Sequence, residues 1–492
     1  MQKRPSLLLY CLCIGMALNS VHAQTFNKTA LATDIDTMMI NHYLKKYYPA
    51  VVDKQYGGIL TGYDRQFNMS GTTDKCLDME SRHLWSSSMG MMLHPEYSGF
   101  KQAADSAFYW IENKVWDKRN GGSAIHSGTN RQCTGSSAIG QYGPQDNTGL
   151  TCDKPLYHEG FALTGLSAYY MATKDTMALY IAKTTFKWLD QKAHDSVYGW
   201  YFGWLDSNGN VLDQTKDDNF GMHWMEGMAW LSLVWPDSTL KARVLEMLTL
   251  FTSPDWFRSD NDICYYQNRT YTDCNGEEYG HDAELVYLIY TCYQMIGVTP
   301  SQTVVSKLKA LHGFVETVST PGVEFENQWW YDAELFASYG SMGALFTTGG
   351  DSSDSYLTKC QTHWNFIKAQ YFDHTYGGWY YTPYDSTYIK GYEWLATYHA
   401  FKCMLFVRNW LFGSQYGWVN PLVSSVKQGE NIQAQKNELQ PNKTHYIMIM
   451  GNSSQLKQAT GLYDLMGRSV SLKYVQSRLS NGNVGAVYIV KP

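Results

Sequence analysis

Apolar side chains recur along most of the chain at the three- and four-residue steps of an amphipathic helix. Residues 103–115 show this pattern, and the stretches 161–170 and 178–189 repeat it with a polar break at 173–175 between them. Positions three or four apart share one face of a helix, so each stretch buries a single apolar face. The pattern predicts pairs of helices joined by short connections.

One loop sequence marks the spacing of these helix pairs. It has the form Asp-x-x-(Tyr/Asn)-Gly-(Gly/Trp) and occurs at 53–58, 117–122, 195–200 and 373–378. The largest gap between copies is close to three steps of about 60 residues, so degenerate copies are expected near 255–257 and 321–323. Six units then span residue 53 to about residue 412.

Repeats of this kind bury their apolar faces against their neighbours, and six units suit closure into a ring. We therefore predict an all-α (α/α)6 toroid whose inner helices and loops surround one central funnel. Short β-hairpins are expected at the Tyr-, Gly- and Trp-rich segments after the loops. An open helical array is the alternative architecture.

The helical pattern ends near Phe412, where a different organisation begins. Residues 413–440 are polar and turn-rich, which is typical of a linker. Strands are predicted beyond it at 445–450, 461–472 and 484–491. The sequence thus predicts a catalytic barrel over 24–412, a linker over 413–440 and a small all-β, sandwich-like domain over 441–492.

Two segments of the C-terminal domain resemble the sorting domain of type IX secretion substrates. They are Leu-Tyr-Asp-Leu-Met-Gly-Arg at 462–468 and Gly-Ala-Val-Tyr-Ile-Val-Lys-Pro at 485–492. The resemblance implies that secretion machinery recognises this tail. A carbohydrate-binding appendage is the alternative.

Residues 1–23 have the composition of a signal peptide. Lys3 and Arg4 precede an apolar stretch over 7–18, and Val-His-Ala at 21–23 forms a small-residue cleavage site. No other segment approaches the roughly 20 apolar residues of a membrane-spanning helix. We expect a protein that is secreted, or that lies at the cell surface or in the periplasm, without a membrane span.

Export permits disulfide bonds between the cysteines of the mature chain. Cys264 and Cys274 lie ten positions apart, and Cys133 and Cys152 flank a Gly- and Ser-rich stretch. Either pair could staple a loop. Zinc binding is the alternative, although no Cys-x-x-Cys sequence occurs.

Composition narrows the class of ligand. The 492 residues carry a formal net charge of −6, which does not favour nucleic acid as a partner. The 38 Tyr and 17 Trp exceed what a core needs, and amphipathic rings of this kind line clefts that bind sugars. Aromatic-rich packing between helices explains the same count.

The sequence His-x-x-Glu occurs twice on predicted helices, at His223–Glu226 and at His281–Glu284. Positions i and i+3 share one helix face, so each imidazole points the same way as its carboxylate. The helices around them are otherwise apolar, which places both pairs toward the funnel, where the carboxylate can tune the histidine pKa. The alternatives are satisfied core histidines and a metal site, since His and Glu are both ligands.

Further polar and aromatic residues stand at the starts of other predicted helices. Arg82 lies among apolar neighbours, where a buried guanidinium needs a partner or a ligand. A surface ion pair between Arg82 and Glu80 is the alternative. Two more clusters supply rings, a carboxylate and an imidazole: Trp329, Trp330 and Glu334, and Trp394 and His399.

The order and spacing of these clusters resemble the N-acylglucosamine 2-epimerase superfamily, which includes cellobiose and mannobiose 2-epimerases and aldose–ketose isomerases. The resemblance covers about 53–412. The matching segments are Arg82 to Trp85, Lys154 with Tyr157 and Phe161, Asn219 with His223 and Glu226, Gly280 to Glu284, Trp329 to Glu334, and Trp394 to His399. The sequence departs from the family pattern at Gly221, where the pattern has a histidine, and at Leu395 and Thr397, where it has a lysine and a proline. Residues 126–153 look like an insertion beside the funnel.

The resemblance implies a sugar 2-epimerase or isomerase that acts on the reducing-end residue of a mono- or oligosaccharide. Such enzymes remove the proton next to the C1 carbonyl, form a cis-enediolate and return a proton, which requires two acid–base groups. His281 and His399 match the family's catalytic pair. The implied substrate-binding residues are Arg82, Tyr157, Asn219, His223, Glu226, Glu284, Trp329, Trp330, Glu334 and Trp394. Neither a cofactor nor a metal ion is expected.

Within that scheme Arg82 and His223 hold the O1 and O2 region of the sugar, while Glu226 and Glu284 orient the imidazoles. Two other functions fit the same sequence. The (α/α)6 toroid also carries glycoside hydrolysis by paired carboxylates, for which Asp217, Asp218 and Glu284 are the candidates. A non-catalytic glycan-binding protein is the other.

Overall fold

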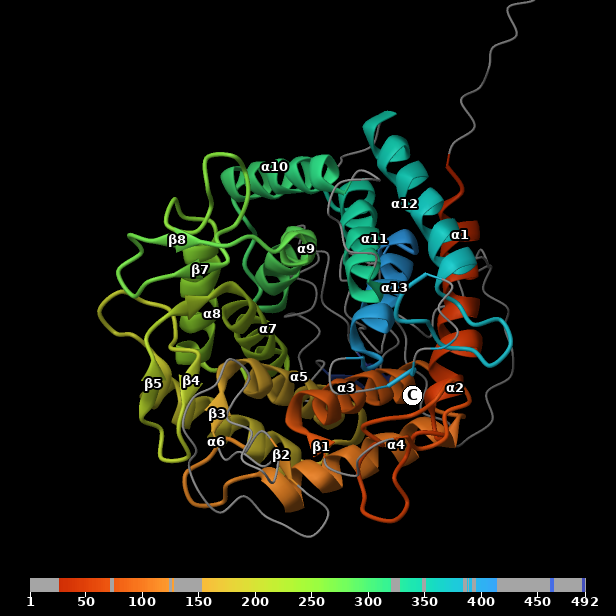
Figure 1. Cartoon of the computed structure of the whole chain (residues 1–492), viewed down its shortest axis with the longest axis horizontal. Coiled ribbons are helices and arrows are strands. Elements are labelled where there is room, and N and C mark those ends of the chain that lie inside the picture. The colour runs from red at the N-terminus through yellow and green to blue at the C-terminus, as the bar shows by residue number, and fades with distance from the viewer. Residues whose placement is uncertain are drawn as a thin grey trace, which may run out of the picture. The chain divides into compact units, whose positions relative to one another are not determined.

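A ring of helices occupies most of the chain in the computed structural model (Figure 1). The structure describes residues 26–70, 75–123, 126–127, 153–319, 328–346, 351–383, 387, 389–391, 395–413, 461–463 and 489–491. Within them, the inner helices are α3 (Leu77–Leu93), α5 (Leu156–Thr173), α7 (Asp218–Val234), α9 (Tyr279–Met295), α11 (Trp329–Ala344) and α13 (Tyr398–Leu411). The outer helices are α1 (Lys28–Thr37), α4 (Ser98–Trp110), α6 (Thr176–Ala193), α8 (Ser238–Phe251), α10 (Gln302–Val318) and α12 (Asp351–Gln370).

Two outer helices continue through short segments of other helical geometry. Helix α1 runs through the π-helical η1 (Met38–Leu44) into α2 (Lys45–Tyr47), and α4 runs into the π-helical η2 (Ile111–Val115). The helices predicted before Asp117, at 161–170 and at 178–189 correspond to α4 with η2, to α5 and to α6. The 3.6-residue period therefore located these elements correctly.

The ring closes through contacts between helices that are distant in sequence. Each inner helix packs against the next one along the chain, and α13 packs against α3. Helix α1 packs against α13, and the indole of Trp364 on α12 donates a hydrogen bond of 2.8 Å to Asp34 on α1. This confirms the (α/α)6 toroid. The repeat pattern placed the first unit at residue 53, and so missed that α1 supplies the sixth outer helix.

Glycine permits the closest approach between neighbouring inner helices. A Cβ at Gly160 of α5 would lie 2.5 Å from the carbonyl oxygen of His223, and one at Gly227 of α7 would lie 2.3 Å from the carbonyl oxygen of Gly160. Real side chains do not tolerate such contacts, so any substitution would push α5 and α7 apart. These two glycines fix the distance at which His223 faces α5.

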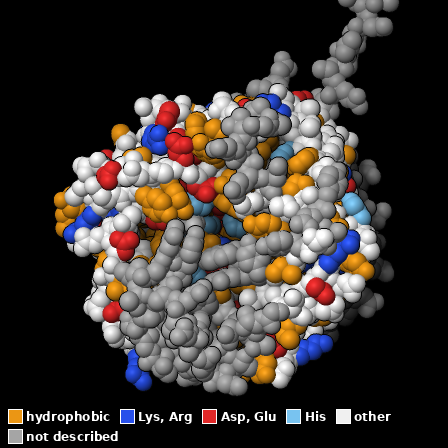
Figure 2. Space-filling model, in the orientation of Figure 1, with side chains coloured by type: hydrophobic (Ala, Val, Ile, Leu, Met, Phe, Trp, Pro, Cys, Tyr) orange, Lys and Arg blue, Asp and Glu red, His pale blue; other side chains and the backbone are white. Residues whose placement is uncertain are grey.

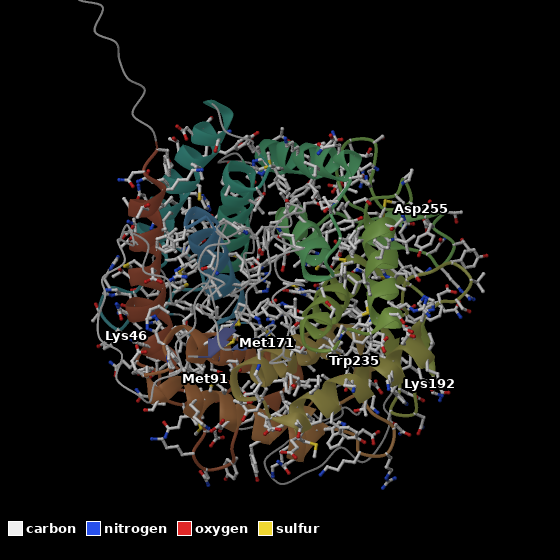
Figure 3. All side chains as sticks on the ribbon, turned by 180° about the vertical axis from the view of Figure 1, so that it is seen from behind. Lys46, Met91, Met171, Lys192, Trp235 and Asp255 are labelled. Carbon is white, nitrogen blue, oxygen red and sulfur yellow. A yellow bond between two sulfur atoms is a disulfide. The ribbon has the colours of Figure 1, made fainter. Side chains whose placement is uncertain are left out.

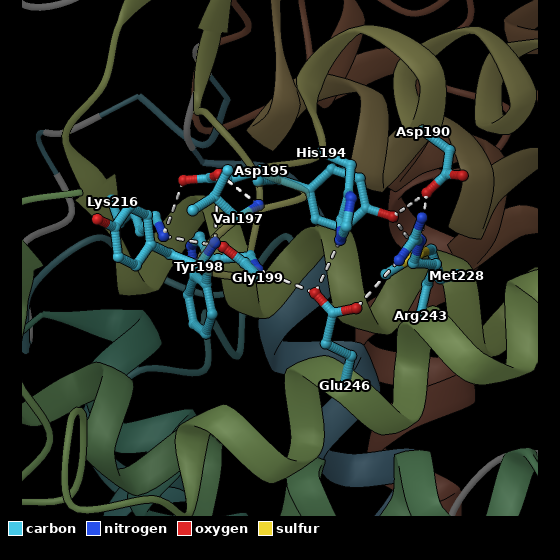
Figure 4. Close-up of polar contacts among 12 residues, drawn as sticks. Asp190, His194, Asp195, Val197, Tyr198, Gly199, Lys216, Met228, Arg243 and Glu246 are labelled. Atoms are coloured by element: carbon cyan, nitrogen blue, oxygen red, sulfur yellow. Dashed lines mark hydrogen bonds and ion pairs between the residues drawn. The ribbon is translucent and has the colours of Figure 1, made fainter. Parts of the chain in front are cut away.

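Buried lysines hold the repeated Asp-Gly loops against the starts of the inner helices. In the loop at 195–200, shown in Figure 4, Lys216 lies 3.4 Å from the carboxylate of Asp195 and donates a hydrogen bond of 2.8 Å to the carbonyl oxygen of Gly199. Glu246 accepts the backbone amide of Trp200 at 3.0 Å on the other side of the loop. Lys216 stands two residues before α7, so the loop positions that helix.

The same ion pair recurs in the other clear copies of the loop. The lysine-to-aspartate distances are 2.6 Å for Lys75 and Asp53, 2.7 Å for Lys154 and Asp117, and 2.8 Å for Lys390 and Asp373. A bridge between Phe257 and Ile263 closes the degenerate copy expected near 255–257, while the copy expected near 321–323 lies outside the described residues. Lys154, which matches a family motif, therefore belongs to this loop clamp.

Short strands precede several inner helices and form the predicted hairpins. The antiparallel sheets are β1 (Lys75–Cys76) with β2 (His126–Ser127), β3 (Lys154–Pro155) with β4 (Trp204–Leu205) and β5 (Val211–Asp213), and β6 (Lys216–Asp217) with β7 (Tyr266–Gln267) and β8 (Cys274–Asn275). Of the two candidate disulfides, the one between Cys264 and Cys274 is present, and Cys274 is the first residue of β8. Cys133 and Cys152 lie outside the described residues.

The chain divides into two units, residues 1–426 and 427–492. In the second unit, the described residues are β9 (Gly461–Tyr463) and β10 (Ile489–Lys491), which pair antiparallel. Both fall within strands predicted from the sequence. The remainder of the predicted β domain, the linker and the signal peptide at 1–23 lie outside the described residues. Within the described part of the chain, no helix is long and apolar enough to span a membrane.

The loop clamp predicts a difference between two lysine substitutions. Lys75→Met leaves the carboxylate of Asp53 buried without its ammonium partner, so the free energy of unfolding should fall by about 3–5 kcal/mol. Lys101→Met is the matched control, because the pair of Lys101 with Asp105 is exposed and contributes little. Denaturant unfolding of both variants measures the difference, and equal losses would contradict the role of the clamp.

Candidate active site

The first two turns of the inner helices meet around a cavity of about 370 Å³. Figure 2 shows histidine side chains at the bottom of a hollow on this face. Figure 3 shows the molecule from behind, and its labels Met91, Met171 and Trp235 mark the carboxyl ends of α3, α5 and α7, the helix ends away from the cavity. The cavity is lined by Arg82, Tyr157, His158, Trp204, Asp217, Asn219, Phe220, His223, Tyr265, Tyr266, Glu278, His281, Glu284, Gln328, Trp329, Trp330 and His399. Amino-terminal helix ends favour negative charge nearby.

His281 on α9 is paired with a carboxylate from the neighbouring inner helix. Its Nδ1 lies 3.2 and 3.3 Å from the two carboxylate oxygens of Asp218, the first residue of α7. Burial alone would lower the pKa of His281, but Asp218, with help from Glu278 and Glu284, raises it to about 9. His281 is therefore protonated at neutral pH. The expectation that Glu284 orients this imidazole is wrong, because Asp218 occupies Nδ1.

His399 on α13 has the opposite protonation preference. Its Nδ1 lies 2.7 Å from Oε1 of Glu334 on α11, and the rings of Trp329 and Trp330 lie 5.6 and 5.8 Å away. Burial lowers the pKa of His399 well below its usual 6.5. Glu284, whose Oε2 lies 3.9 Å from Nδ1, opposes this effect, while the positive charges of Lys402 and Arg82 add to it. The cavity thus raises the pKa of the imidazole on α9 and lowers the pKa of the imidazole on α13.

His223 forms the predicted pair with Glu226 on α7. Its Nδ1 lies 3.3 Å from Oε2 of Glu226, whose other oxygen accepts a hydrogen bond from the hydroxyl of Tyr398. Burial lowers the pKa of His223 well below 6.5. The His223 ring centroid lies 6.2 Å from that of His399, so this pair stands beside the neutral catalytic candidate.

Arg82 is buried at the side of the cavity. It donates a hydrogen bond to the hydroxyl of Tyr157, lies 4.2 Å above the ring of Phe161 and is 3.9 Å from Asp78. The alternative of a surface pair with Glu80 is wrong, because Glu80 is buried and accepts the backbone amide of Ile59 at 2.7 Å. The guanidinium is held by two aromatic rings and faces the cavity.

The other predicted site residues fall into three groups. Asn219, Trp329, Trp330 and Glu284 line the cavity. Glu226 and Glu334 are buried behind it, in contact with His223 and His399 respectively, and do not line it. Trp394 lies outside the described residues.

Sequence reasoning overlooked residues that complete the site. Asp218 was named only as a hydrolase carboxylate, and Lys402 was not named at all. Lys402 is fully buried, donates a hydrogen bond to Oε1 of Glu284 and lies 3.4 Å from Oε1 of Glu334. The one usable signal was its position three residues after His399, which places both side chains on one face of α13. His158, directly after Tyr157, also lines the cavity.

Comparison with known proteins places the chain beside sugar-converting enzymes. No family model matches the chain. It is 22% identical over 382 residues to the cellobiose 2-epimerase of Bacteroides fragilis, which covers 72% of this chain and 90% of that protein. It is 23% identical over 411 residues to the cellobiose 2-epimerase of Ruminococcus albus, which covers 75% of this chain and 96% of that protein.

Solved structures show the same fold. The cellobiose 2-epimerase from Spirochaeta thermophila matches with a TM-score of 0.68 at 20% identity, covering 78% of this chain and 98% of that one. A D-mannose isomerase matches with a TM-score of 0.64 at 16% identity, covering 78% and 97%. These similarities support the N-acylglucosamine 2-epimerase superfamily. They also support a carbohydrate epimerase or isomerase.

One departure from the superfamily pattern has a structural reason. The superfamily pattern has a histidine at the position of Gly221, but a Cβ there would lie 2.1 Å from the indole ring of Trp200. Trp200, the last residue of the Asp195 loop, stacks on Trp256 with ring centroids 4.1 Å apart. The packing of this aromatic pair therefore excludes any side chain at residue 221. At another departure, Thr397 bonds the hydroxyl of Tyr48 at 2.9 Å.

Three groups of side chains in the described residues are close enough to hold a metal ion: Cys76, Asp78 and His158; His223, Glu226 and Glu284; and Glu284, Glu334 and His399. The ammonium of Lys402 already contacts the carboxylates of Glu284 and Glu334. A cation in the last group would have to displace that ammonium or share its carboxylates. The reaction proposed below uses side chains alone.

The Asp218 contact predicts how His281 titrates. Asp218→Asn removes the charge that raises the pKa, so the pKa of His281 should fall by about 1–3. Because the folded-state pKa of about 9 lies above the usual 6.5, the stabilisation from this pair is complete below pH 6.5 and is lost as pH rises through 9.

Histidine NMR titration of wild type and variant measures the change. Asp217→Asn is the control, since the Asp217 carboxylate accepts the amide of Phe220 at 3.1 Å and has no hydrogen bond to His281 among the described contacts. The control should lower the pKa of His281 by less. An unchanged pKa in Asp218→Asn would refute the assignment.

Proposed function

We propose that this protein is a sugar 2-epimerase or isomerase that acts on the reducing-end residue of a mono- or oligosaccharide by two-histidine proton transfer. One observation carries the proposal: His281 and His399 line the same cavity, where Asp218 raises the pKa of the first imidazole and burial lowers the pKa of the second. Exchange of a proton on carbon requires a base that accepts it and an acid that returns it. A carbohydrate partner is consistent with the aromatic rings of Trp329 and Trp330 in the cavity wall.

The proposed reaction begins with the open-chain sugar, whose C1 carbonyl acidifies the C2 proton. Neutral His399 accepts that proton while the C2–H electrons form the C1=C2 bond and the carbonyl electrons move to O1. The protonated His281 and the guanidinium of Arg82 offset the negative charge of the cis-enediolate. His281 then returns a proton to C2 on the opposite face for epimerisation, or a proton returns at C1 for aldose–ketose isomerisation.

The relatives indicate which sugars should be tested first as substrates. The two curated relatives described above are cellobiose 2-epimerases, so the proposed substrate class includes disaccharides whose reducing end enters the cavity. The isomerase alternative follows from the same enediolate, which can take up a proton at C1 instead of C2. The D-mannose isomerase shares its fold with this chain. No cofactor takes part in the proposed steps.

The hydrolase alternative would use two carboxylates that flank a glycosidic bond. Asp218 and Glu284 are each already paired with a cation, His281 and Lys402 respectively. Asp217 lines the cavity, and burial together with the neighbouring charge of Asp218 raises its pKa to about 7, but its carboxylate caps α7. This arrangement supports a proton-transfer site of imidazoles over a site of free carboxylates.

Incubation with cellobiose in D2O, followed by proton NMR, tests the proposal. Deuterium at C2 with inverted configuration indicates the epimerase, and deuterium at C1 of a ketose product indicates the isomerase. New reducing ends would indicate the hydrolase. If a panel of mono- and oligosaccharides shows neither exchange nor cleavage, the glycan-binding alternative replaces the enzyme.

The two-histidine mechanism predicts the effect of removing either imidazole. His281→Ala and His399→Ala should each lower turnover by about 10²–10⁴-fold or more, measured at a temperature where circular dichroism shows each variant to be folded. His94→Ala is the control, because His94 follows the carboxyl end of α3 and pairs with the exposed Glu96. Near-wild-type turnover in either catalytic variant would exclude the two-base mechanism.

We also propose that the protein is exported, with a signal peptide at 1–23 and a tail at 441–492 that secretion machinery recognises. The charged start, the apolar stretch and the Val-His-Ala site support the first, and the two segments at 462–468 and 485–492 support the second. Mass spectrometry of the exported protein should find Gln24 as its first residue. An intact Met1 in exported protein would contradict the proposed cleavage.

A further inference from the structure

Lys402 is a buried cation that the proposed proton transfers do not use. It lies on α13 one turn after His399, and its side chain is 0% exposed. Its ammonium donates a hydrogen bond to Oε1 of Glu284 on α9 and lies 3.4 Å from Oε1 of Glu334 on α11. A buried charge is costly unless it is paired, so α9, α11 and α13 are tied together at this point.

Several donors converge on the carboxylate of Glu334. Its Oε1 lies 2.7 Å from Nδ1 of His399 and 3.4 Å from the ammonium of Lys402. Its Oε2 accepts a hydrogen bond from the hydroxyl of Tyr287. An ionised carboxylate can accept all of these, whereas a carboxylic acid would have to donate its own proton to one of them. Among these neighbours, Nδ1 of His399 is the nitrogen able to accept it.

The ionisation of Glu334 therefore decides which nitrogen of His399 carries the proton. If Glu334 is a carboxylate, Nδ1–H donates to it, and the lone pair of Nε2 is free. If Glu334 is an acid, its O–H donates to Nδ1, and the neutral ring carries its proton on Nε2. A base that removes a proton from a sugar needs the free lone pair on the nitrogen that Glu334 does not hold.

We propose that Lys402 is a positioning residue that fixes the tautomer of His399: its ammonium keeps Glu334 ionised, so that Nδ1 holds the proton and Nε2 remains the base. Without the ammonium, the site takes up one proton from water. Glu334 becomes a carboxylic acid and His399 becomes the Nε2–H tautomer. The tautomer itself is independent of the substrate, whereas its use as a base rests on the function proposed above.

Titratable groups on five of the inner helices contribute to this balance. They are Arg82 on α3, His223 and Glu226 on α7, His281, Glu284 and Tyr287 on α9, Glu334 on α11, and Tyr398, Lys402 and Cys403 on α13. Burial raises the pKa of Glu334, and Lys402 is the strongest influence that opposes this rise. Lys402 is thus the neighbour whose removal most favours protonation of Glu334.

Long-range proton–nitrogen NMR of ¹⁵N-histidine-labelled full-length protein reads the tautomer directly, with His399→Gln to assign the signals. Wild type should show a protonated Nδ1 and an unprotonated Nε2 at neutral pH. Lys402→Met should show the reverse, and Lys402→Arg should restore the wild-type pattern because it returns the positive charge. An Nδ1–H tautomer in Lys402→Met would overturn the proposal.

Two further variants separate positioning from folding. Lys402→Met combined with Glu284→Gln removes one anion together with the cation, so it should be more stable than Lys402→Met alone, and it should still show the Nε2–H tautomer. Lys390→Met removes another buried lysine, which pairs with Asp373 in a loop, and should leave the tautomer of His399 unchanged. A wild-type tautomer in the folded double variant overturns the proposal, as does a switched tautomer in Lys390→Met.

Kinetics distinguish this inference from the proposed function. In Lys402→Met, kcat should fall about 100-fold with KM nearly unchanged, and Lys402→Arg should recover most of it. If the tautomer switches as expected but wild type converts no sugar, the inference stands and the proposed function fails. If wild type converts sugar and the tautomer does not switch, the function stands and the inference fails.

Discussion

The central constraint of this molecule is a positive charge at the closed centre of a helical ring. The ammonium of Lys402 has no access to solvent, and its carboxylate partners Glu284 and Glu334 come from two other helices. The carboxylates offset the cost of burying the ammonium only if they lie within contact distance of it. The spacing of α9, α11 and α13 is therefore tied to these contacts. His399 shares Glu334 with Lys402, which links the fold of the ring to the state of an imidazole in its cavity.

A second constraint acts at the rim of the ring. Buried lysines hold the Asp-Gly loops, and acidic residues in the first turns of inner helices bind the same loops through backbone amides, as Glu80 binds Ile59 and Asp282 binds Ile263. The amino-terminal ends of the inner helices are thus fixed from outside while Lys402 fixes them from within. The cavity lies at these ends, where helix dipoles favour negative charge.

The sequence predicted local features well because they depend on period and spacing. The helical period located the barrel helices that it was applied to, and the i, i+3 rule correctly paired His223 with Glu226. The same rule was wrong for His281, because its Nδ1 contacts Asp218 and not Glu284. Asp218 lies on the preceding inner helix, 63 residues earlier in the sequence. Which carboxylate reaches a given imidazole depends on the distance between helices, and one helix alone does not contain that information.

Other parts of the site were hidden for related reasons. Lys402 occupies a position on α13 among buried apolar residues, and its spacing from His399 is the one local feature that sets it apart from a surface lysine before α9 and α11 are in place. Glu334 was predicted to bind substrate, but the ring places it behind His399. The need for a glycine at residue 221 becomes apparent only when the indole of Trp200 is in place beside it. Trp394, the signal peptide and most of the C-terminal domain remain predictions.

The central claim is that two histidines in one cavity hold opposite protonation states when the site is at rest. Neutron diffraction from crystals at neutral pD tests it most directly, because deuterons on ring nitrogens are visible. The account predicts deuterons on both nitrogens of His281 and on Nδ1 alone of His399. A doubly deuterated His399, or a His281 with one deuteron, would contradict it.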